Sequence, residues 1–174
     1  MDDLSTSKQR EAGIREALVQ LLSMLWDREV DYLIVGGLAA IAHGAWRPLN
    51  DIDLLVPESD LHEIAREWQA YQSKPLDRHV GGQWDVVYAQ FVIEGIVIEI
   101  GSASDTYIQR ADTGQWHPLE VDLAQYELRE PFDLRMKVMP RRELIQYKQL
   151  LDRAVDRDDL WMLAQAEPAI SRQG

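Results

Sequence analysis

The chain has 174 residues, of which 30 are acidic and 18 basic, and it carries a formal net charge of −12 and no cysteine. This balance argues against a general nucleic-acid-binding protein, which needs a broad basic surface. A chain without cysteine forms no disulfide, thiolate metal site or cysteine nucleophile. No apolar run is long enough to cross a bilayer and the first residues are polar, so we expect a cytoplasmic protein without a membrane partner.

Hydrophobic periodicity and turn residues divide the chain into helices and short strands. Apolar residues spaced along one helix face predict helices, and short apolar runs bounded by Gly or Pro predict strands. The predicted elements are a helix over 7–27, a strand over 32–35, a helix over 38–43 closed by Gly44, a strand over 52–56, a helix from a Ser59 cap to about 70, a hairpin of strands over 86–93 and 96–100, a strand near 119–123, a helix over 143–151, and a helix from an Asp156 cap to 163. This order predicts one domain, residues 1–174, of α/β (α+β) class with a small mixed sheet flanked by helices.

The stretch DIDLLV places two carboxylates on one face of a predicted strand. Asp51 and Asp53 lie two residues apart, and residues i and i+2 of an extended chain point the same way. Like charges this close raise each other's pKa unless something offsets them, and a divalent cation would do so. Mg²⁺ and Mn²⁺ prefer oxygen ligands and share them with phosphates, so the pattern indicates a metal site for phosphoryl or nucleotidyl transfer.

Glu99, in the run IVIEI, is the candidate for a third carboxylate. It lies on the strand face opposite to the apolar isoleucines, where a lone acid is also typical of the solvent side of a sheet. If the predicted hairpin lies beside the strand that carries Asp51 and Asp53, Glu99 completes a three-carboxylate site. Asp85 and Glu94 are the fallback candidates for the third acid.

A glycine pair and two cations are the candidates for holding phosphates. Gly36 and Gly37 would let backbone N–H groups approach an anion closely, although a plain tight turn has the same sequence. Arg47 and Lys148 are the candidate phosphate-binding cations, with surface ion pairs as the alternative. For His43, at the end of the short helix, a structural contact with a carbonyl is favoured over catalysis.

Together, the glycine pair, His43-Gly44, Arg47 and DIDLLV resemble the nucleotidyltransferase superfamily. The shared pattern is a glycine pair, a short helix, Asp-x-Asp on a strand and a later acidic strand. The stretch looks most like the small minimal nucleotidyltransferases and the abortive-infection-toxin-like members of bacteria and archaea. The resemblance covers a catalytic core of about residues 30–100 and, more loosely, C-terminal helices over about 140–165.

The resemblance implies a reaction and a role for each candidate residue. An NTP, usually ATP, would give its nucleoside monophosphate to a hydroxyl-type acceptor and release pyrophosphate. Asp51, Asp53 and Glu99 would bind Mg²⁺ or Mn²⁺, with Glu99 also serving as the general base, and Gly36 and Gly37 would hold the triphosphate. The acceptor stays open among a small molecule such as an aminoglycoside, a protein side chain and the end of a tRNA, and the acidic charge disfavours tRNA.

Two departures from the superfamily pattern favour an alternative hypothesis. Glu99 stands where Asp is common and reaches one methylene farther, and Leu49 stands where many relatives have Thr. The second hypothesis is therefore a catalytically degenerate module that binds a nucleotide or a protein partner, as one half of a toxin–antitoxin pair. The hypotheses differ on one point, because an active enzyme needs all three acids in one cluster.

Overall fold

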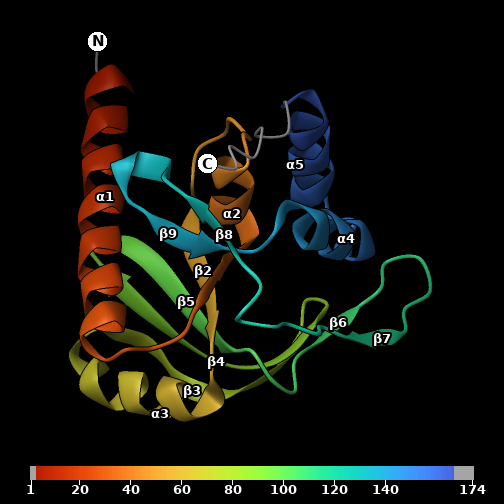
Figure 1. Ribbon diagram of the computed structural model, residues 1–174, viewed down its shortest axis with the longest axis horizontal. Helices are drawn as coiled ribbons and strands as arrows, with labels where there is room; N and C mark the ends of the chain where they lie inside the picture. The colour runs from red at the N-terminus through yellow and green to blue at the C-terminus, as the bar shows by residue number, and fades with distance from the viewer. Residues whose placement is uncertain (1–2, 167–174) are drawn as a thin grey trace, which may run out of the picture.

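The computed structural model describes residues 3–166, which form helices around a mixed nine-stranded sheet (Figure 1). The elements in chain order are α1 (Asp3–Asp27), β1 (Leu33–Val35), α2 (Gly36–Ala42), β2 (Asp51–Val56), α3 (Glu58–Glu67), a 3₁₀ turn (Gln69–Tyr71), β3 (Gln72–Gly81), β4 (Trp84–Ile93), β5 (Ile96–Ser102), β6 (Tyr107–Gln109), β7 (Trp116–Pro118), β8 (Glu127–Arg129), a 3₁₀ turn (Pro131–Asp133), β9 (Met136–Val138), α4 (Arg141–Leu151) and α5 (Ala154–Gln165). The predicted fold class, a mixed sheet flanked by helices, is confirmed.

The sheet has the strand order β7-β6-β4-β5-β2-β1-β9-β8. The strand β3 lies outside this order and pairs with β4. The strand β2 lies at its centre, antiparallel to β1 and parallel to β5. The helix α2 connects β1 to β2, so the residues at the start of α2 lie beside those that begin β2. The hairpin β4–β5 is antiparallel and is joined at Glu94-Gly95, as predicted.

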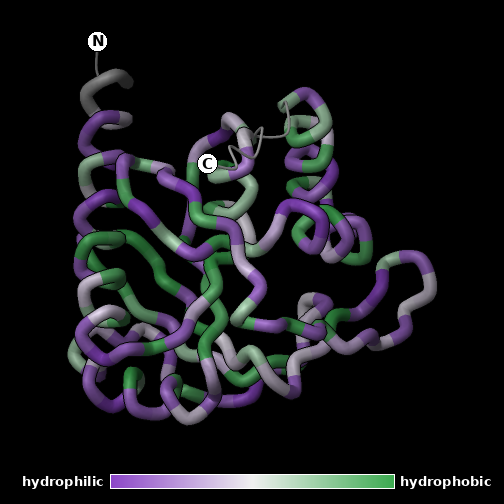
Figure 2. The backbone as a smooth tube through the Cα atoms, in the orientation of Figure 1, coloured by the Kyte–Doolittle hydropathy of each residue, from purple (hydrophilic) through white to green (hydrophobic). Residues whose placement is uncertain are grey.

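The core lies on the face of the central strands that carries their apolar residues. Ile52 and Leu54 of β2 and Ile98 and Ile100 of β5 are fully buried, while the residues between them are only partly buried. The helices α1 and α3 both contact β5, and Figure 2 shows apolar stretches of chain through the middle of the molecule. The alternation predicted from the sequence therefore leaves the second face of β2 and β5 free for polar side chains.

The helix α1 follows the predicted periodicity and begins earlier than expected. Its buried residues recur at helical spacing, which turns one face toward the core; they are Ile14, Ala17, Leu18, Leu21, Met24 and Leu25. Within residues 3–166, no helix is both long and apolar enough to cross a membrane.

Several predicted boundaries and one predicted strand are wrong. Residues 119–123 form no strand, and the strands nearby are short segments on either side of that stretch. The strand β3 was not predicted, because it is exposed almost throughout and contains Pro75. Pro57, and not Ser59, occupies the cap of α3. Asp156 lies inside α5 at its third position, where its carboxylate accepts the backbone N–H of Arg153, the residue that caps the helix.

Candidate active site

A cleft of about 500 Å³ opens on the polar face of the central strands. The strands β2, β4 and β5 form its floor, the start of α2 and the loop after it form one side, and α4 and the start of α5 close another. The hairpin β3–β4 extends beside it. All seven predicted site residues line this one cleft, and they are Gly36, Gly37, Arg47, Asp51, Asp53, Glu99 and Lys148.

The strand register brings the three predicted acids onto one face, called the acid face below and made of Asp51, Asp53 and Glu99. Asp53 pairs directly with Glu99 across the parallel strands β2 and β5. Residues paired in this way point to the same side of the sheet, on strands about 5 Å apart. Asp51 follows the same alternation on β2, so the acid face is fixed by backbone pairing.

The acid face is crowded with negative charge. Burial and the charges of Asp51 and Glu99 together raise the pKa of Asp53 to about 8, although Lys148 and Arg153 oppose the shift. Among residues 3–166, no cation forms an ion pair with any of the three acids. A carboxylate that holds its proton at neutral pH inside a cleft is typical of a functional site.

A hydrogen-bonded chain fixes the orientation of Glu99. Its Oε1 accepts a hydrogen bond from Gln90 Nε2 at 2.7 Å, and Gln90 Oε1 accepts one from the Ser73 hydroxyl at 2.9 Å. Gln90 lies opposite Glu99 on β4, and Ser73 lies on β3. The chain of hydrogen bonds therefore anchors Oε1 of Glu99, a residue that lines the cleft. The fallback acids are elsewhere, because Asp85 pairs with Arg78 at 2.7 Å and Glu94 lies in the hairpin turn.

The two glycines make room for charged side chains. Gly36 has φ +63°, and a Cβ there would overlap Asp53 Oδ2. A Cβ on Gly37 would come within 2.9 Å of Arg47 Nη2. Glycine adopts the positive φ of Gly36 without strain, and the absence of a Cβ at both positions leaves space for the neighbouring charged side chains. The pair therefore begins α2 itself, two residues earlier than predicted, and lets the guanidinium and the Asp53 carboxylate approach the backbone.

Arg47 and Lys148 line the cleft, and both contact a buried aspartate that was not predicted. Arg47 Nε and Nη2 donate to Asp159 at 2.5 and 2.9 Å, and Lys148 Nζ lies 2.8 Å from Asp159 Oδ2 and 3.2 Å from Asp156 Oδ1. Arg153, which also lines the cleft, donates to Asp156 at 2.7 Å. We call these five residues the cation wall.

The charges of the cation wall stabilise one another. Burial alone would raise the pKa of Asp159, yet hydrogen bonds from Arg47 and Lys148 hold it below its ordinary value. The pKa of Asp156 is likewise held down, against burial, by Arg153 and Lys148. Both aspartates are fully buried and therefore ionised only because they are paired.

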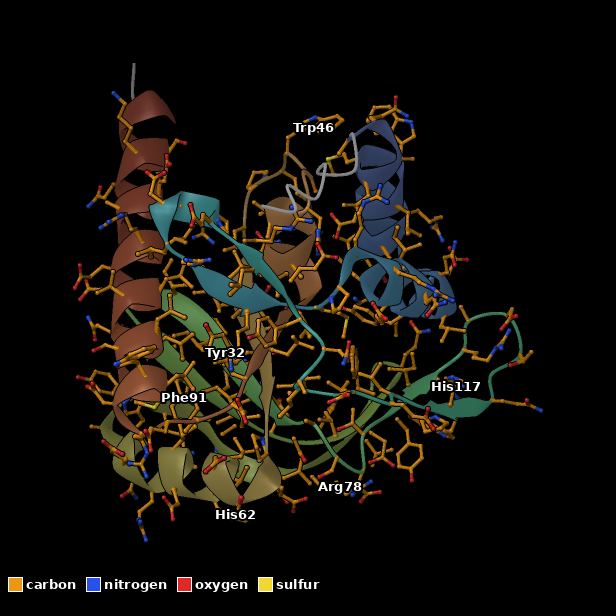
Figure 3. The ribbon with its side chains drawn as sticks, viewed as in Figure 1. Tyr32, Trp46, His62, Arg78, Phe91 and His117 are labelled. Carbon is orange, nitrogen blue, oxygen red and sulfur yellow. The ribbon has the colours of Figure 1, made fainter. Side chains whose placement is uncertain are left out.

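His43 and Trp46 lie outside the cleft. A ring nitrogen of His43, Nε2, donates to the Met139 carbonyl at 2.8 Å, which confirms the predicted structural contact. Burial lowers the pKa of His43. Trp46 is exposed at the top of the molecule in Figure 3 and stacks edge-to-face on Trp161 of α5, with ring centroids 5.6 Å apart.

The acid face suits a divalent cation in charge and in donor type. Hard ions take carboxylate oxygens, and a bound cation would offset the repulsion that raises the pKa of Asp53. Within residues 3–166, no three carboxylate or imidazole groups converge closely enough, as the side chains stand, to share one ion. A shared ion would thus need rotation of side chains on a backbone that already aligns Asp53 with Glu99.

The chain is similar to solved structures of nucleotidyltransferases. No family model and no curated protein matches it. A Thermotoga maritima protein assigned as a nucleotidyltransferase matches with a TM-score of 0.62 and 23% identity, over 88% of this chain and 96% of its own. The lincosamide antibiotic adenylyltransferase LnuA, bound to lincomycin, matches with a TM-score of 0.59 and 13% identity, over 87% and 97%.

A third solved structure agrees with these two. ANT(2″)-Ia in complex with adenylyl-2″-tobramycin matches with a TM-score of 0.57 and 13% identity, over 87% of each chain. The fold of residues 3–166 is therefore that of the nucleotidyltransferases, as the sequence resemblance implied. At these identities the likeness concerns the fold, and the chemistry has to be argued from the residues of the cleft.

Proposed function

We propose that this chain is a metal-dependent nucleotidyltransferase that moves a nucleoside monophosphate from an NTP, ATP by preference, to a hydroxyl-type acceptor and releases pyrophosphate. One observation carries the proposal: the register of β2 and β5 aligns Asp53 with Glu99, beside Asp51, in a cleft that four Lys and Arg side chains also line. The fold of the similar solved structures supports the same reading.

Asp51, Asp53 and Glu99 would hold Mg²⁺ or Mn²⁺. When bound, such an ion neutralises the charge that develops on the phosphates and lowers the pKa of a coordinated hydroxyl. Asp53 also sets a condition on metal binding. Asp53 has to lose its proton before its oxygens can ligate an ion, and its raised pKa makes that loss dependent on pH.

The residues of the cleft divide the remaining work of the reaction. The acceptor hydroxyl oxygen forms a bond to the α-phosphorus while the bond from the α-phosphorus to the bridging oxygen breaks, so pyrophosphate leaves. Glu99 takes the hydroxyl proton on Oε2, because Gln90 already occupies Oε1. Arg47 and Lys148, with Gly36 and Gly37, bind the triphosphate and hold the departing pyrophosphate.

The acceptor is a hydroxyl compound whose class the cleft leaves open. The names of two similar structures refer to antibiotics, lincomycin and tobramycin, which supports a small molecule. A protein side chain or the end of a tRNA would fit the same chemistry. We propose the small molecule first because the chain is strongly acidic overall, which disfavours a nucleic acid.

A degenerate nucleotide-binding or protein-interaction module is the second candidate. The observation that favours it is the resting state of the charges: Glu99 is engaged by Gln90, and each cation of the cation wall is paired. A module of this kind would bind NTP and a protein partner, as in a toxin–antitoxin pair, without transferring the nucleotide.

The two candidates separate in one assay. Purified protein is incubated with each α-labelled NTP and Mg²⁺ or Mn²⁺, with and without fractionated cell lysate, and label transfer and pyrophosphate release are followed. Transfer by the wild type and none by Asp51→Asn/Asp53→Asn supports the enzyme. Nucleotide binding without transfer in any fraction supports the module. Neither binding nor transfer overturns both.

A further inference from the structure

We propose that Arg153 is a third phosphate-binding cation of this cleft, and that the buried aspartates Asp156 and Asp159 of α5 are positioning residues that aim Arg47, Lys148 and Arg153 at one triphosphate. The proposal rests on the proposed function and adds to it a phosphate-binding residue and the element that orients it. The residues involved come from the loop after α2, from α4, and from α5 with its cap. The helices α2, α4 and α5 contact one another (Figure 1).

Asp159 fixes the plane of the Arg47 guanidinium. Its two oxygens accept from Nε and Nη2, and the Pro48 carbonyl accepts from Nη1 at 3.2 Å. One N–H on Nη1 and one on Nη2 then remain without a partner among residues 3–166. Both nitrogens lie over Gly37, within 2.9 and 3.4 Å of where a Cβ would be. A bidentate carboxylate on one edge of a guanidinium thus leaves the other edge for a phosphate.

Lys148 connects the two aspartates. Its ammonium lies 2.8 Å from Asp159 and 3.2 Å from Asp156, and its side chain is only 2% exposed. A lysine on a flexible stem has many rotamers, and two acceptors on one side restrict it to one. The ammonium is therefore held in one position beside the cleft, which Lys148 lines.

Asp156 does for Arg153 what Asp159 does for Arg47. Arg153 donates through Nε at 2.7 Å and through Nη2 at 3.1 Å to the two Asp156 oxygens, a second bidentate pair. Its side chain is 40% exposed, whereas Asp156 is fully buried. Arg153 is thus the most exposed of the three cations, and it lines the cleft with its remaining N–H groups free to reach a ligand.

The two aspartates of the cation wall lie behind its three cations. Neither lines the cleft, and each has no exposed surface, so neither can touch a substrate. Asp156 and Asp159 lie three residues apart and therefore share one face of α5. Three cations against two aspartates leave the cation wall with a net positive charge, and its cations line the same cleft as the acid face. A polyanion entering between the two walls would meet N–H groups whose directions are already set.

The test measures binding of Mg²⁺-tripolyphosphate to the full chain by isothermal titration calorimetry, since this probe contains the phosphates and no base. We expect Arg153→Gln and Asp159→Asn each to weaken binding about tenfold, as for loss of one charge-assisted pair. The matched controls are Arg157→Gln and Asp158→Asn, exposed residues of the same helix, which should stay within about twofold of the wild type. Circular dichroism shows whether each variant is folded at the temperature of the titration.

A second comparison separates positioning from a merely structural role. In an Arg47→Ala/Lys148→Ala background, adding Asp159→Asn should change the tripolyphosphate affinity by less than about twofold, because the groups that it orients are gone. If Asp159→Asn does not fold, Arg47→Lys replaces it, since lysine keeps the charge and loses the bidentate contact. Wild-type affinity in Arg153→Gln, or an equal loss in both backgrounds, would overturn this proposal alone. A wild type that binds neither tripolyphosphate nor NTP would overturn the proposed function as well.

Discussion

The acid face and the cation wall balance their charges in different ways. The three carboxylates of the acid face are aligned by the pairing of β2 with β5 and have no cation within ion-pair distance among the described residues. The cation wall is built from side chains of three separate segments, and each of its cations contacts a buried aspartate. One wall is therefore fixed by backbone and lacks counter-charge, while the other is fixed by the counter-charges themselves.

The difference shows how substitutions should act on each wall. Removing a carboxylate from the acid face relieves repulsion and leaves the strands intact, so function should suffer more than stability. Removing an aspartate from the cation wall leaves a buried cation without its partner, so stability and function should fall together.

The largest effect is expected at the paired aspartates. Asp51→Asn/Asp53→Asn removes two of the three proposed metal ligands and should reduce nucleotide transfer by about 10³-fold or more. Because the double variant removes repulsion, its unfolding temperature should equal or exceed that of the wild type. Transfer assays and calorimetric melting measure the two quantities. A variant that unfolds would show that the carboxylates are structural.

The next effect concerns the proposed base. Glu99→Gln keeps the shape of the side chain and removes the proton acceptor, so transfer should fall about 10²- to 10⁴-fold while NTP still binds. Glu94→Gln is the matched control, because it changes an acid of the same hairpin that lies in the turn away from the cleft. Single-turnover kinetics with α-labelled NTP make the comparison. Equal rates in both variants would remove Glu99 from the mechanism.

Gly36→Ala should disturb the fold and the acid face together. The residue has φ +63°, and its new Cβ would overlap Asp53 Oδ2. We expect a loss of about 1–3 kcal/mol in the free energy of unfolding, together with loss of transfer. Gly95→Ala separates the two causes, because Gly95 also has positive φ, +72°, with no atom within 4 Å of the added Cβ. Urea titrations of both variants should show the greater loss for Gly36→Ala.

The smallest effect is a change in how stability depends on pH. Asp53 has a pKa of about 8 in the folded chain against an ordinary value of 3.8. Between these values the unfolded chain has lost the proton that the folded chain keeps, so the free energy of unfolding falls as the pH rises. Asp53→Asn removes this dependence, so its free energy of unfolding should differ little from that of the wild type near pH 4 and should exceed it at pH 8.5. Parallel curves at both pH values would contradict the assignment.

The sequence predicted the acid face well because that face depends on local alternation. Asp51 and Asp53 alternate with apolar residues on β2, as Glu99 does on β5. That β5 lies beside β2 was only a condition in the sequence analysis, and the structure supplies this pairing. The strand β3 could not be predicted from the sequence, because it has few apolar residues and an internal Pro75. Its formation depends on pairing with β4 and not on its own hydrophobic pattern.

The cation wall was only half visible in the sequence. Arg47 and Lys148 were identified, but their partner Asp159 lies more than a hundred residues from Arg47, and no local pattern reports such a pair. A signal did exist on α5. Asp156 and Asp159 share a helix face with the buried Leu163, at spacings of three and four residues, which places both acids on the inner side. Buried acids on a helix indicate cations from elsewhere in the fold.

A titration of Mn²⁺ into the protein with ATP, followed by electron paramagnetic resonance at pH 7 and at pH 9, tests the proposed metal site most directly. We expect the wild type to bind Mn²⁺ and to bind it more tightly at pH 9, since Asp53 must lose its proton to become a ligand. We expect Asp51→Asn/Asp53→Asn not to bind Mn²⁺ beyond the amount held by ATP alone. Equal binding by the two proteins at both pH values would contradict the claim that the acid face is a metal site.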